Sequence, residues 1–205
     1  YIGLLSSTIG LMDTENFTYP ELTNEININC GGITADAAIY TDSKNFDKYS
    51  IMFEIKGKAL YEKMSFVLDM MNEMIFNTKY SDYKRLKEII ARIKSRLESS
   101  MTSSGHTVAM LNGMAQFSET SYYSNKIRGY EFYRLIQELD KDFDNKKEII
   151  AGNLKKLVQL IFTSDNLKVS ITADEEGYKD FVKPVSTFIG TLNKSDIDVK
   201  AAKRQ

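Results

Sequence analysis

Histidine, cysteine, tryptophan and proline are scarce in this 205-residue sequence, with one, one, no and two copies. The lone cysteine, Cys30, cannot form an intramolecular disulfide, which favours a reducing compartment and a cytoplasmic location. The lone histidine, His106, cannot supply the two imidazoles of a two-histidine zinc site. We therefore expect this chain to hold no metal of its own.

Long apolar runs and an excess of one charge are also missing. No run approaches the roughly 20 apolar residues that a membrane helix needs, so we expect no membrane partner. The 27 basic and 28 acidic residues leave a net charge of −1, which provides no broad positive field for nucleic acid. The 42% of hydrophobic residues is ordinary for a globular protein, and the chain is long enough to bury a core without disulfides or metals.

Local capping signals predict a helix in the first part of the chain. Thr18 supplies a hydroxyl at the N-cap, Pro20 suits the first turn, and Glu21 stands where a capping box needs a carboxylate. The predicted helix covers 20–29 and ends at a pair of glycines. We expect the first of these, Gly31, to take a positive φ, because glycine has no Cβ to clash in the left-handed region.

Alternation of apolar and polar residues predicts strands over 33–40 and 49–55, joined by a polar loop into an antiparallel hairpin. The same alternation predicts a third strand over 167–173. After it, Asp174 is placed to cap a last helix. That helix contains Pro184, so we expect it to be kinked there or to begin late.

Apolar residues at helical spacing predict the remaining helices, over approximately 1–12, 60–75, 83–101, 108–117, 129–140 and 146–163. This order of elements is α+β, with an antiparallel sheet packed against a layer of long helices. We expect one domain over 1–192 and a polar tail or linker over 193–205. The first residues read as part of a helix, so we expect the chain to be a piece of a longer protein.

Two residues are candidates for nucleophilic catalysis. His106 follows a Ser-Ser-Gly break between helices, and the fold would have to bring Cys30 to it to form a dyad. A capping or packing histidine and a structural thiol explain these residues better. No partner lies at a diagnostic spacing, and Cys30 follows a helix C-terminus, whose partial negative charge disfavours a thiolate.

Three aspartates, Asp140, Asp142 and Asp144, have the D-x-D-x-D spacing with which a calcium loop begins. The sixth position of such a loop needs glycine and the twelfth needs glutamate, but Asn145 and Ala151 occupy them. A polar connection that caps the following helix explains the three carboxylates better.

Two patterns have some features of nucleic-acid-binding surfaces. One is the basic stretch over 84–96, and the other is a set of tyrosines, namely Tyr122, Tyr123, Tyr130 and Tyr133. Glutamates interrupt the basic stretch and the two patterns do not interleave, which favours a solvated helix face and a tyrosine-rich packing layer. We expect no nucleic-acid partner.

Three stretches taken together resemble a known family. They contain YPEL and GGI (within 19–33), RLK, SRLE and SGH (within 85–106), and DNL and IT (within 165–172). In order and spacing they resemble the third domain of the presequence-protease subfamily of pitrilysin-like (insulinase) zinc metallopeptidases. The resemblance covers nearly the whole chain, from residue 1 to about residue 188.

The resemblance implies a fold and a role. In that family two halves, each made of two related α+β domains, close around a chamber that admits unfolded peptides. The zinc motif, an inverted H-x-x-E-H, lies in the first domain, and basic and tyrosine residues that help the reaction lie in the last. No segment of this chain matches either set, so we expect it to contain no catalytic, cofactor-binding or metal-binding residue.

The implied function is a noncatalytic chamber wall in a bacterial, cytoplasmic zinc metalloendopeptidase that degrades unfolded peptides, with strands 33–40 and 49–55 in its sheet. The implied partners are the other domains of the polypeptide and the peptide substrate. Zinc belongs to the parent enzyme, and the domain's first strand is truncated. The alternative is a protein-interaction scaffold module without peptidase activity, and an inactive homologue of the peptidase stands between the two. An upstream H-x-x-E-H in the same reading frame would favour the first.

Overall fold

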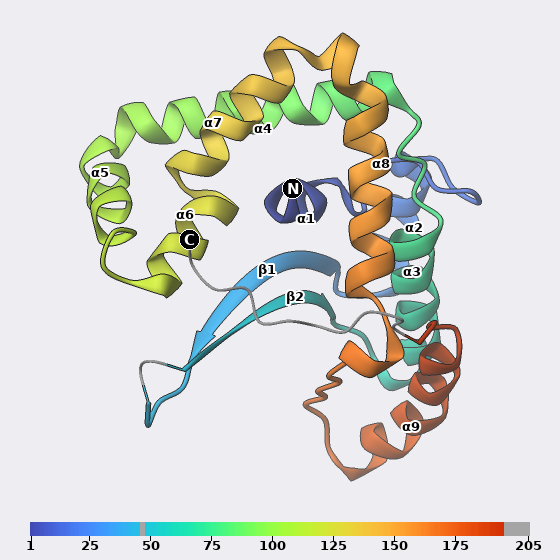
Figure 1. The fold of residues 1–205 in the computed structure, drawn as a ribbon. Helices are drawn as coiled ribbons and strands as arrows, with labels where there is room; N and C mark the ends of the chain where they lie inside the picture. Colours follow the sequence, from blue (N-terminus) through green and yellow to red (C-terminus); the bar gives the residue numbers. More distant parts are fainter. Residues whose placement is uncertain (46–47, 195–205) are drawn as a thin grey trace.

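The computed structural model describes residues 1–45 and 48–194 (Figure 1). Its two strands are β1 (Ile33–Thr41) and β2 (Tyr49–Gly57), and short 3₁₀ turns cover Tyr61–Lys63 and Ser164–Asn166. Its α-helices are α1 (Ile2–Thr8), α2 (Tyr19–Asn29), α3 (Met64–Phe76), α4 (Tyr83–Ser103), α5 (Gly105–Met114), α6 (Glu119–Arg128), α7 (Tyr130–Lys141), α8 (Phe143–Ile161) and α9 (Glu175–Gly190). The predicted α+β class, with helices packed against a small antiparallel sheet, is confirmed.

Helix α1 lies near the centre of the molecule, between the hairpin and the pair formed by α4 and α7 (Figure 1). Helix α3 packs against α9, and α5 and α6 lie at the opposite end of the molecule from α2 and α3. Among the described residues, no helix combines the length and the apolar character needed to cross a membrane. The largest fully buried side chains of the core come from α1, α2, α4, α7 and α8 and include Leu4, Leu5, Leu22, Leu86, Ile90, Ile136, Ile150 and Leu154.

Gly3 allows α1 to lie against the main chain of its neighbours. A Cβ at this position would stand 2.1 Å from the carbonyl oxygen of Ile127, in α6, and 3.0 Å from the ring of Phe132, in α7. The first distance is far shorter than van der Waals contact, so a larger residue would push α1 away. The central position of α1 therefore depends on this glycine.

The capping signals predict α2 correctly. The Thr18 amide and hydroxyl donate hydrogen bonds of 2.9 and 2.7 Å to the Glu21 carboxylate, and these bonds hold the pKa of Glu21 below its usual value. The expected positive φ at Gly31 is wrong, because the left-handed residue is Gly32, with φ of 109°. Cys30 leaves the helix in an extended conformation, with φ of −149°, so the chain turns only just before β1.

The predicted hairpin is confirmed. β1 and β2 pair antiparallel, with Ala37 opposite Phe53 and Ile39 opposite Ile51. The odd-numbered residues of both strands share one face, which packs on the helices. Ala37 is fully buried there, and the ring of Phe53 meets that of Phe162 edge-on, with 5.5 Å between centroids. The even-numbered residues form the opposite face.

The predicted third strand is wrong. Residues 167–174 run without regular structure between the 3₁₀ turn and α9, and the described sheet consists of β1 and β2. Alternation makes a segment suitable for a sheet, but its backbone groups need a neighbouring strand to pair with. Val169 is 46% exposed, which shows that the apolar side of this segment has no core to face in the described structure.

Helix α6 is one that periodicity does not reveal. Ile127 is its one aliphatic residue, so no apolar stripe marks it. Its start is set by Ser118, whose hydroxyl accepts a hydrogen bond of 3.4 Å from the amide of Ser121. Local capping, together with contacts to α5, α7 and β1, therefore forms this helix.

Helix α9 begins where the sequence predicts. The Asp174 side chain accepts a hydrogen bond of 2.9 Å from the amide of Gly177. The helix does not begin late, because Pro184 lies inside a single helix that ends at Gly190. Of the predicted tail, residues 195–205 lie outside the described residues, and the bounds of the domain stay a prediction.

Candidate functional site

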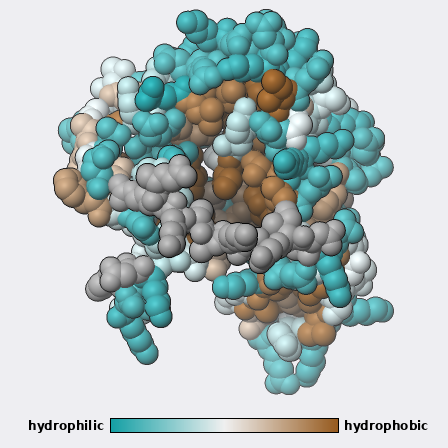
Figure 2. Space-filling model, in the orientation of Figure 1, coloured by the Kyte–Doolittle hydropathy of each residue, from teal (hydrophilic) through white to brown (hydrophobic). Residues whose placement is uncertain are grey.

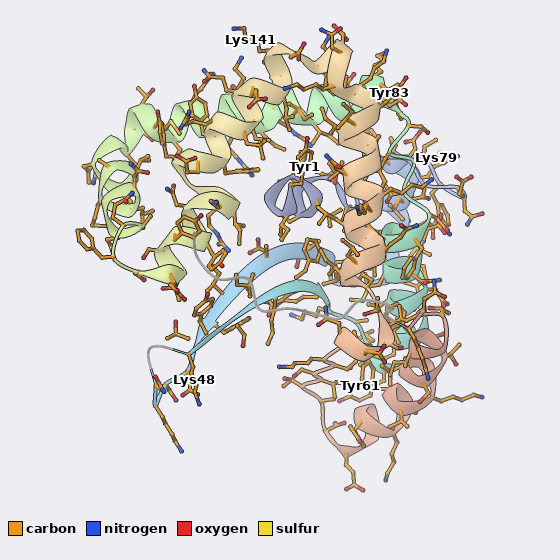
Figure 3. All side chains as sticks on the ribbon, viewed as in Figure 1. Tyr1, Lys48, Tyr61, Lys79, Tyr83 and Lys141 are labelled. Atoms are coloured by element: carbon orange, nitrogen blue, oxygen red, sulfur yellow. The ribbon has the colours of Figure 1, made fainter. Side chains whose placement is uncertain are left out.

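The face of the hairpin that points away from the helices is the surface that the predicted role concerns. We call it the polar face; its residues are Thr34, Asp36, Ala38 and Tyr40 of β1 and Ser50, Met52, Glu54 and Lys56 of β2. All of these side chains are exposed or half-buried. Figure 3 shows the hairpin extending past the helices, with Lys48 near its far end. The polar face is therefore accessible to a large molecule.

Glu54 connects the charged groups of the polar face. Its carboxylate lies 2.6 Å from the Lys56 ammonium nitrogen and accepts a hydrogen bond from the Tyr40 hydroxyl. The contact with Lys56 and, after it, the hydrogen bond from Tyr40 hold the pKa of Glu54 below its usual value. The Glu54 carboxylate in turn raises the pKa of Tyr40 and of Lys56. At neutral pH the face thus carries a carboxylate, a phenol and an ammonium group.

The outer edge of β1 is partly covered by α6. The Arg128 guanidinium donates a hydrogen bond to the carbonyl oxygen of Ala37 and lies 4.0 Å from the carboxylate of Asp36. Both ends of this ion pair are more than half exposed, so we expect it to contribute little to stability. Its structural effect is to occupy a carbonyl group that a further strand would use.

The outer edge of β2 is open in the described structure. The amide of Asp42 donates to the carbonyl of Lys48 at 2.9 Å, and the amide of Lys58 donates to that of Gly32 at 3.2 Å. Even-numbered residues of β2 therefore bond inward to β1, and the odd-numbered residues 49–55 direct their backbone groups outward. The described residues contain no strand that pairs with this edge. Such an edge can accept an extended segment.

Tyrosines join the far part of β2 to α6. The Tyr49 ring lies 5.8 Å from that of Tyr123, which lies 5.3 Å from that of Tyr122, and the Lys126 ammonium stands 4.4 Å above the Tyr122 ring. A hydrogen bond with Glu119, followed by burial, raises the pKa of Tyr49 to about 12. These ring contacts agree with the predicted packing layer.

The structure does not bring the two candidate nucleophilic-catalysis residues together. His106 is exposed in the first turn of α5, and Cys30 follows α2 at the other end of the molecule (Figure 1). The Cys30 thiol donates to the carbonyl oxygen of Ile26 at 3.2 Å, as a structural thiol does. No dyad exists between them.

The three aspartates of the calcium-like spacing each lie near a lysine at the turn between α7 and α8. Asp140 lies 2.8 Å from Lys94, and Asp144 lies 3.0 Å from Lys87, while Asp142 accepts from the Asn145 amide. No group of three or more histidine, cysteine, aspartate or glutamate residues in the described ranges is arranged to hold a metal ion. The lysines of the basic stretch thus serve to join α4 to this turn.

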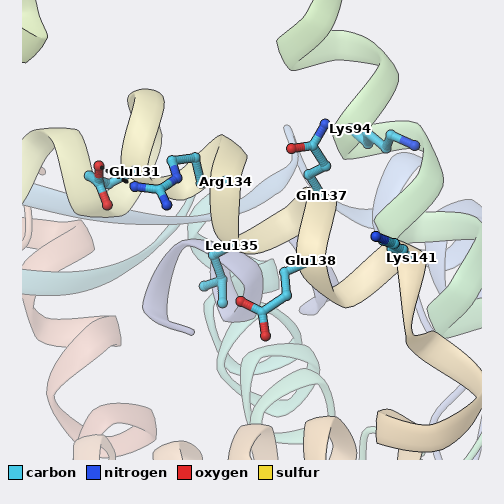
Figure 4. A pocket seen from close by; sticks show the side chains of 7 residues that line it. All are labelled: Lys94, Glu131, Arg134, Leu135, Gln137, Glu138 and Lys141. Carbon is cyan, nitrogen blue, oxygen red and sulfur yellow. Dashed lines mark ion pairs between the residues drawn. The ribbon is translucent and has the colours of Figure 1, made fainter.

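An open hollow of about 830 Å³ lies along α4 and α7 (Figure 4). Its lining combines both charges and one apolar side chain: Lys94, Glu131, Arg134, Leu135, Gln137, Glu138 and Lys141. The Arg134 guanidinium points toward the Glu131 carboxylate, 3.6 Å away. Because the lining carries charges of both signs along an open helix face, it offers no enclosed pocket for a specific ligand.

Comparison with known proteins decides the family. The model of the family described as peptidase M-16C associated matches residues 1–139, from α1 to α7. This chain belongs to that family. Over 198 residues, the chain is 32% identical to "Protein HypA" of Clostridium perfringens, an alignment that covers 97% of this peptidase-associated chain and 20% of the relative.

Other relatives of this peptidase-associated chain are named as proteases. It is 22% identical to "Presequence protease 1, chloroplastic/mitochondrial" of Arabidopsis thaliana, over 93% of the chain and 18% of the relative. It is 24% identical to "Presequence protease, mitochondrial" of Drosophila melanogaster, over 95% of the chain and 19% of the relative. The chain thus spans about a fifth of the length of these relatives.

Proposed function

We propose that this chain is a noncatalytic chamber-wall domain of a larger zinc-dependent metalloendopeptidase that degrades unfolded peptides. The match to the peptidase-associated family carries this proposal. Relatives named presequence proteases align with nearly the whole chain, which spans only about a fifth of their length. A chain of that size supplies one part of such an enzyme and not the whole.

The zinc of the proposed enzyme does not fit the residues of this chain. The one imidazole, His106, lies exposed on α5, and no described cluster of donor side chains surrounds it. A catalytic zinc site needs three protein ligands around one point. We therefore place the metal in another domain of the parent polypeptide and assign no chemical step to the residues described above.

The hairpin suits the role of a wall because its two faces differ. The apolar face is anchored on the helices through residues such as Ala37 and Phe53, which keeps the sheet in place. The polar face presents hydroxyl, carboxylate and ammonium groups, with Glu54 held between Tyr40 and Lys56. Such groups can exchange hydrogen bonds with the main chain of an extended peptide without selecting one sequence.

The rival function is a protein-interaction scaffold module without peptidase activity. The open outer edge of β2 supports it, because an exposed edge can also bind an extended segment of a partner protein. The two functions differ in one measurable respect. A wall contributes to hydrolysis by the parent enzyme, and a scaffold does not.

We propose a cytoplasmic location for the parent, on the ground that one cysteine favours a reducing compartment. A bacterial source belongs to the same proposal. Relatives named for mitochondria and chloroplasts supply the competing possibility, namely an organelle. Fractionation of the source cells, followed by detection of the chain in each fraction, tests this proposal.

Hydrolysis of an unfolded fluorogenic peptide tests the main proposal. The catalytic part of the parent polypeptide is assayed alone, mixed with this chain, and fused to it. We expect hydrolysis to appear or rise strongly when this chain is present, because the closed chamber orients the peptide and excludes water. Equal rates with and without the chain would replace the wall with the scaffold module.

Two variants show whether the polar face takes part. Glu54→Ala removes the central carboxylate of that face, and Asp144→Ala removes an exposed carboxylate at the turn between α7 and α8. We expect Glu54→Ala to raise KM for the peptide about threefold or more, as expected when ground-state binding is lost. We expect Asp144→Ala to leave KM unchanged. Equal effects of the two substitutions would contradict a substrate-facing polar face.

A further inference from the structure

A stretch without charged side chains runs through α5. From residue 99 to residue 118 the sequence contains no aspartate, glutamate, lysine or arginine, although 27% of the whole chain is charged. Helix α5 has no buried residue. A surface helix usually carries charges on its exposed side. Their absence here therefore needs an explanation other than packing within the described chain.

Large apolar side chains gather on one side of α5. Met110 and Met114 are one turn apart and are 57% and 45% exposed, and Leu111 is 37% exposed. Phe117, in the turn that follows, is 90% exposed, and its amide bonds to the carbonyl of Met114 at 3.0 Å. Gly113 lies between Met110 and Phe117 on the same side of the helix. We call Met110, Leu111, Met114 and Phe117 the α5 face.

The composition of the α5 face is that of an interface core. Methionine and aromatic residues are enriched and charged residues depleted at the centre of protein interfaces. Figure 2 shows pale brown atoms over α5, whereas most of the neighbouring outer surface is teal. Gly113 adds a place for close approach, because a Cβ there would meet no atom within 4 Å. The α5 face therefore has the character of a contact surface.

The shape of the α5 face excludes some occupants. Helix α5 stands at one end of the molecule, against α4 and α6, and its face is convex (Figure 1). An unfolded peptide binds in a groove or along a sheet edge, not on a projecting helix. A convex apolar helix face fits instead into a groove on another folded body.

The size of the α5 face argues against a second copy of the chain. A ten-residue helix is about 15 Å long and about 10 Å across, so this face offers about 150 Å². A stable complex between free proteins buries about 800 Å² on each partner. A tethered domain needs much less area, because a short linker supplies an effective concentration in the millimolar range.

We propose that the α5 face docks into an apolar, uncharged groove on another domain of the same polypeptide. The inference rests on the proposed function, which makes this chain one part of a longer enzyme. The relatives are about five times as long as the chain, so the polypeptide has ample length to supply such a domain. Docking removes the four apolar side chains from water and holds α5 in place.

Thiol labelling in the full polypeptide tests the docking. The reporter is Gly113→Cys in a Cys30→Ser background, which leaves all four side chains of the α5 face intact. The matched control is Ile28→Cys on α2, at a position that is 70% exposed. We expect a maleimide to label position 113 about tenfold or more slowly in the full polypeptide than in the 205-residue chain, because docking closes access. Position 28 should label equally fast in both.

A second variant connects the protection to the α5 face. Met114→Glu, added to the reporter, places a charge in the proposed contact and should restore fast labelling at position 113. Equal labelling of position 113 in both proteins, or equal slowing at positions 113 and 28, overturns the proposal. Protection that grows with the concentration of the 205-residue chain assigns the face to a second copy, and protection that needs added peptide assigns it to substrate. Either result also overturns it.

The outcome is independent of the proposed function. Peptide hydrolysis with and without this chain reports whether it contributes to a peptidase. Labelling at position 113 reports only whether α5 is covered. An enzyme that depends on this chain but leaves position 113 freely labelled contradicts the docking alone.

Discussion

The buried carboxylate of Glu73 provides the sharpest test of what stabilises this fold. Glu73 lies in α3 and is 6% exposed. It accepts hydrogen bonds of 3.1 and 2.9 Å from the amide and the side chain of Asn16, and a further one from the side chain of Asn77. It thereby ties the loop after α1 to the end of α3, across 57 positions of sequence.

Replacing Glu73 with alanine removes all of these bonds. Each hydrogen bond to a charged group contributes about 1.5–3 kcal/mol to stability, and the contributions do not add in full when several share one acceptor. The freed amides of Asn16 and Asn77 regain some water. We expect Glu73→Ala to lower the free energy of unfolding by about 2–3 kcal/mol. For a chain of this size, that corresponds to a fall in melting temperature of about 4–12 °C.

The acid dependence follows from the pKa of Glu73. Burial acts to raise this pKa, but hydrogen bonds from Thr14, Asn77 and Asn16 outweigh burial and hold it below its usual value. A carboxyl group with a lowered pKa stabilises the folded state above its unfolded pKa, about 4.3, and loses that effect as the pH falls through the folded pKa. Glu73→Gln does not titrate. We therefore expect the stability gap between wild type and Glu73→Gln to be full at neutral pH and to shrink in acid.

Urea unfolding followed by circular dichroism measures these differences, at neutral pH and at about pH 3.5, where the gap should have narrowed. The matched control is Glu148→Ala, which removes an exposed carboxylate from α8 and should change stability by no more than about 0.5 kcal/mol. The reasoning fails if Glu73→Ala unfolds at the wild-type urea concentration. It also fails if the gap to Glu73→Gln is the same at both pH values.

Two further predictions concern the backbone and the metal. Gly32→Val should lower the free energy of unfolding by about 1–3 kcal/mol, because its φ of 109° is strained for a residue with a Cβ. Gly152→Ala, at a helical position with no atom within 4 Å of a new Cβ, should raise it by about 0.5–1 kcal/mol; urea midpoints that coincide for both variants would contradict this reasoning. The dialysed chain should carry no stoichiometric zinc by plasma mass spectrometry, because one exposed imidazole cannot complete a site. One equivalent of zinc that disappears in His106→Ala would refute that prediction.

Local chemistry explains the elements that the sequence predicts well. The capping box at Thr18 and Glu21 acts within one turn, so α2 is predictable without knowledge of the rest of the chain. The alternation in β1 and β2 places Ala37 and Phe53 on the buried face, and the short polar loop makes their pairing the simplest one. The long apolar stripes of α3, α4 and α8 give the same result for helices.

The errors lie where the outcome depends on distant neighbours. Residues 167–173 alternate as a strand does, yet a strand forms only beside another strand, and the described structure supplies none there. Helix α6 lacks an apolar stripe and forms through its cap at Ser118 and its contacts with α5, α7 and β1. The left-handed glycine is Gly32, one position later than predicted, because the conformation of Cys30 decides where the chain turns.

The candidate surfaces divide in the same way. Sequence alone is enough to show that one histidine, one cysteine and a broken calcium pattern make a poor catalytic centre, since donor chemistry depends on residue type. The same is true of the uncharged stretch through α5, which can be read directly from the sequence. The grouping of Tyr40, Glu54 and Lys56, the outward direction of the β2 backbone and the exposure of Met110 and Phe117 required the tertiary structure. Pairing register and helix packing bring such groups together or leave them uncovered, and both depend on contacts between residues that are far apart in the chain.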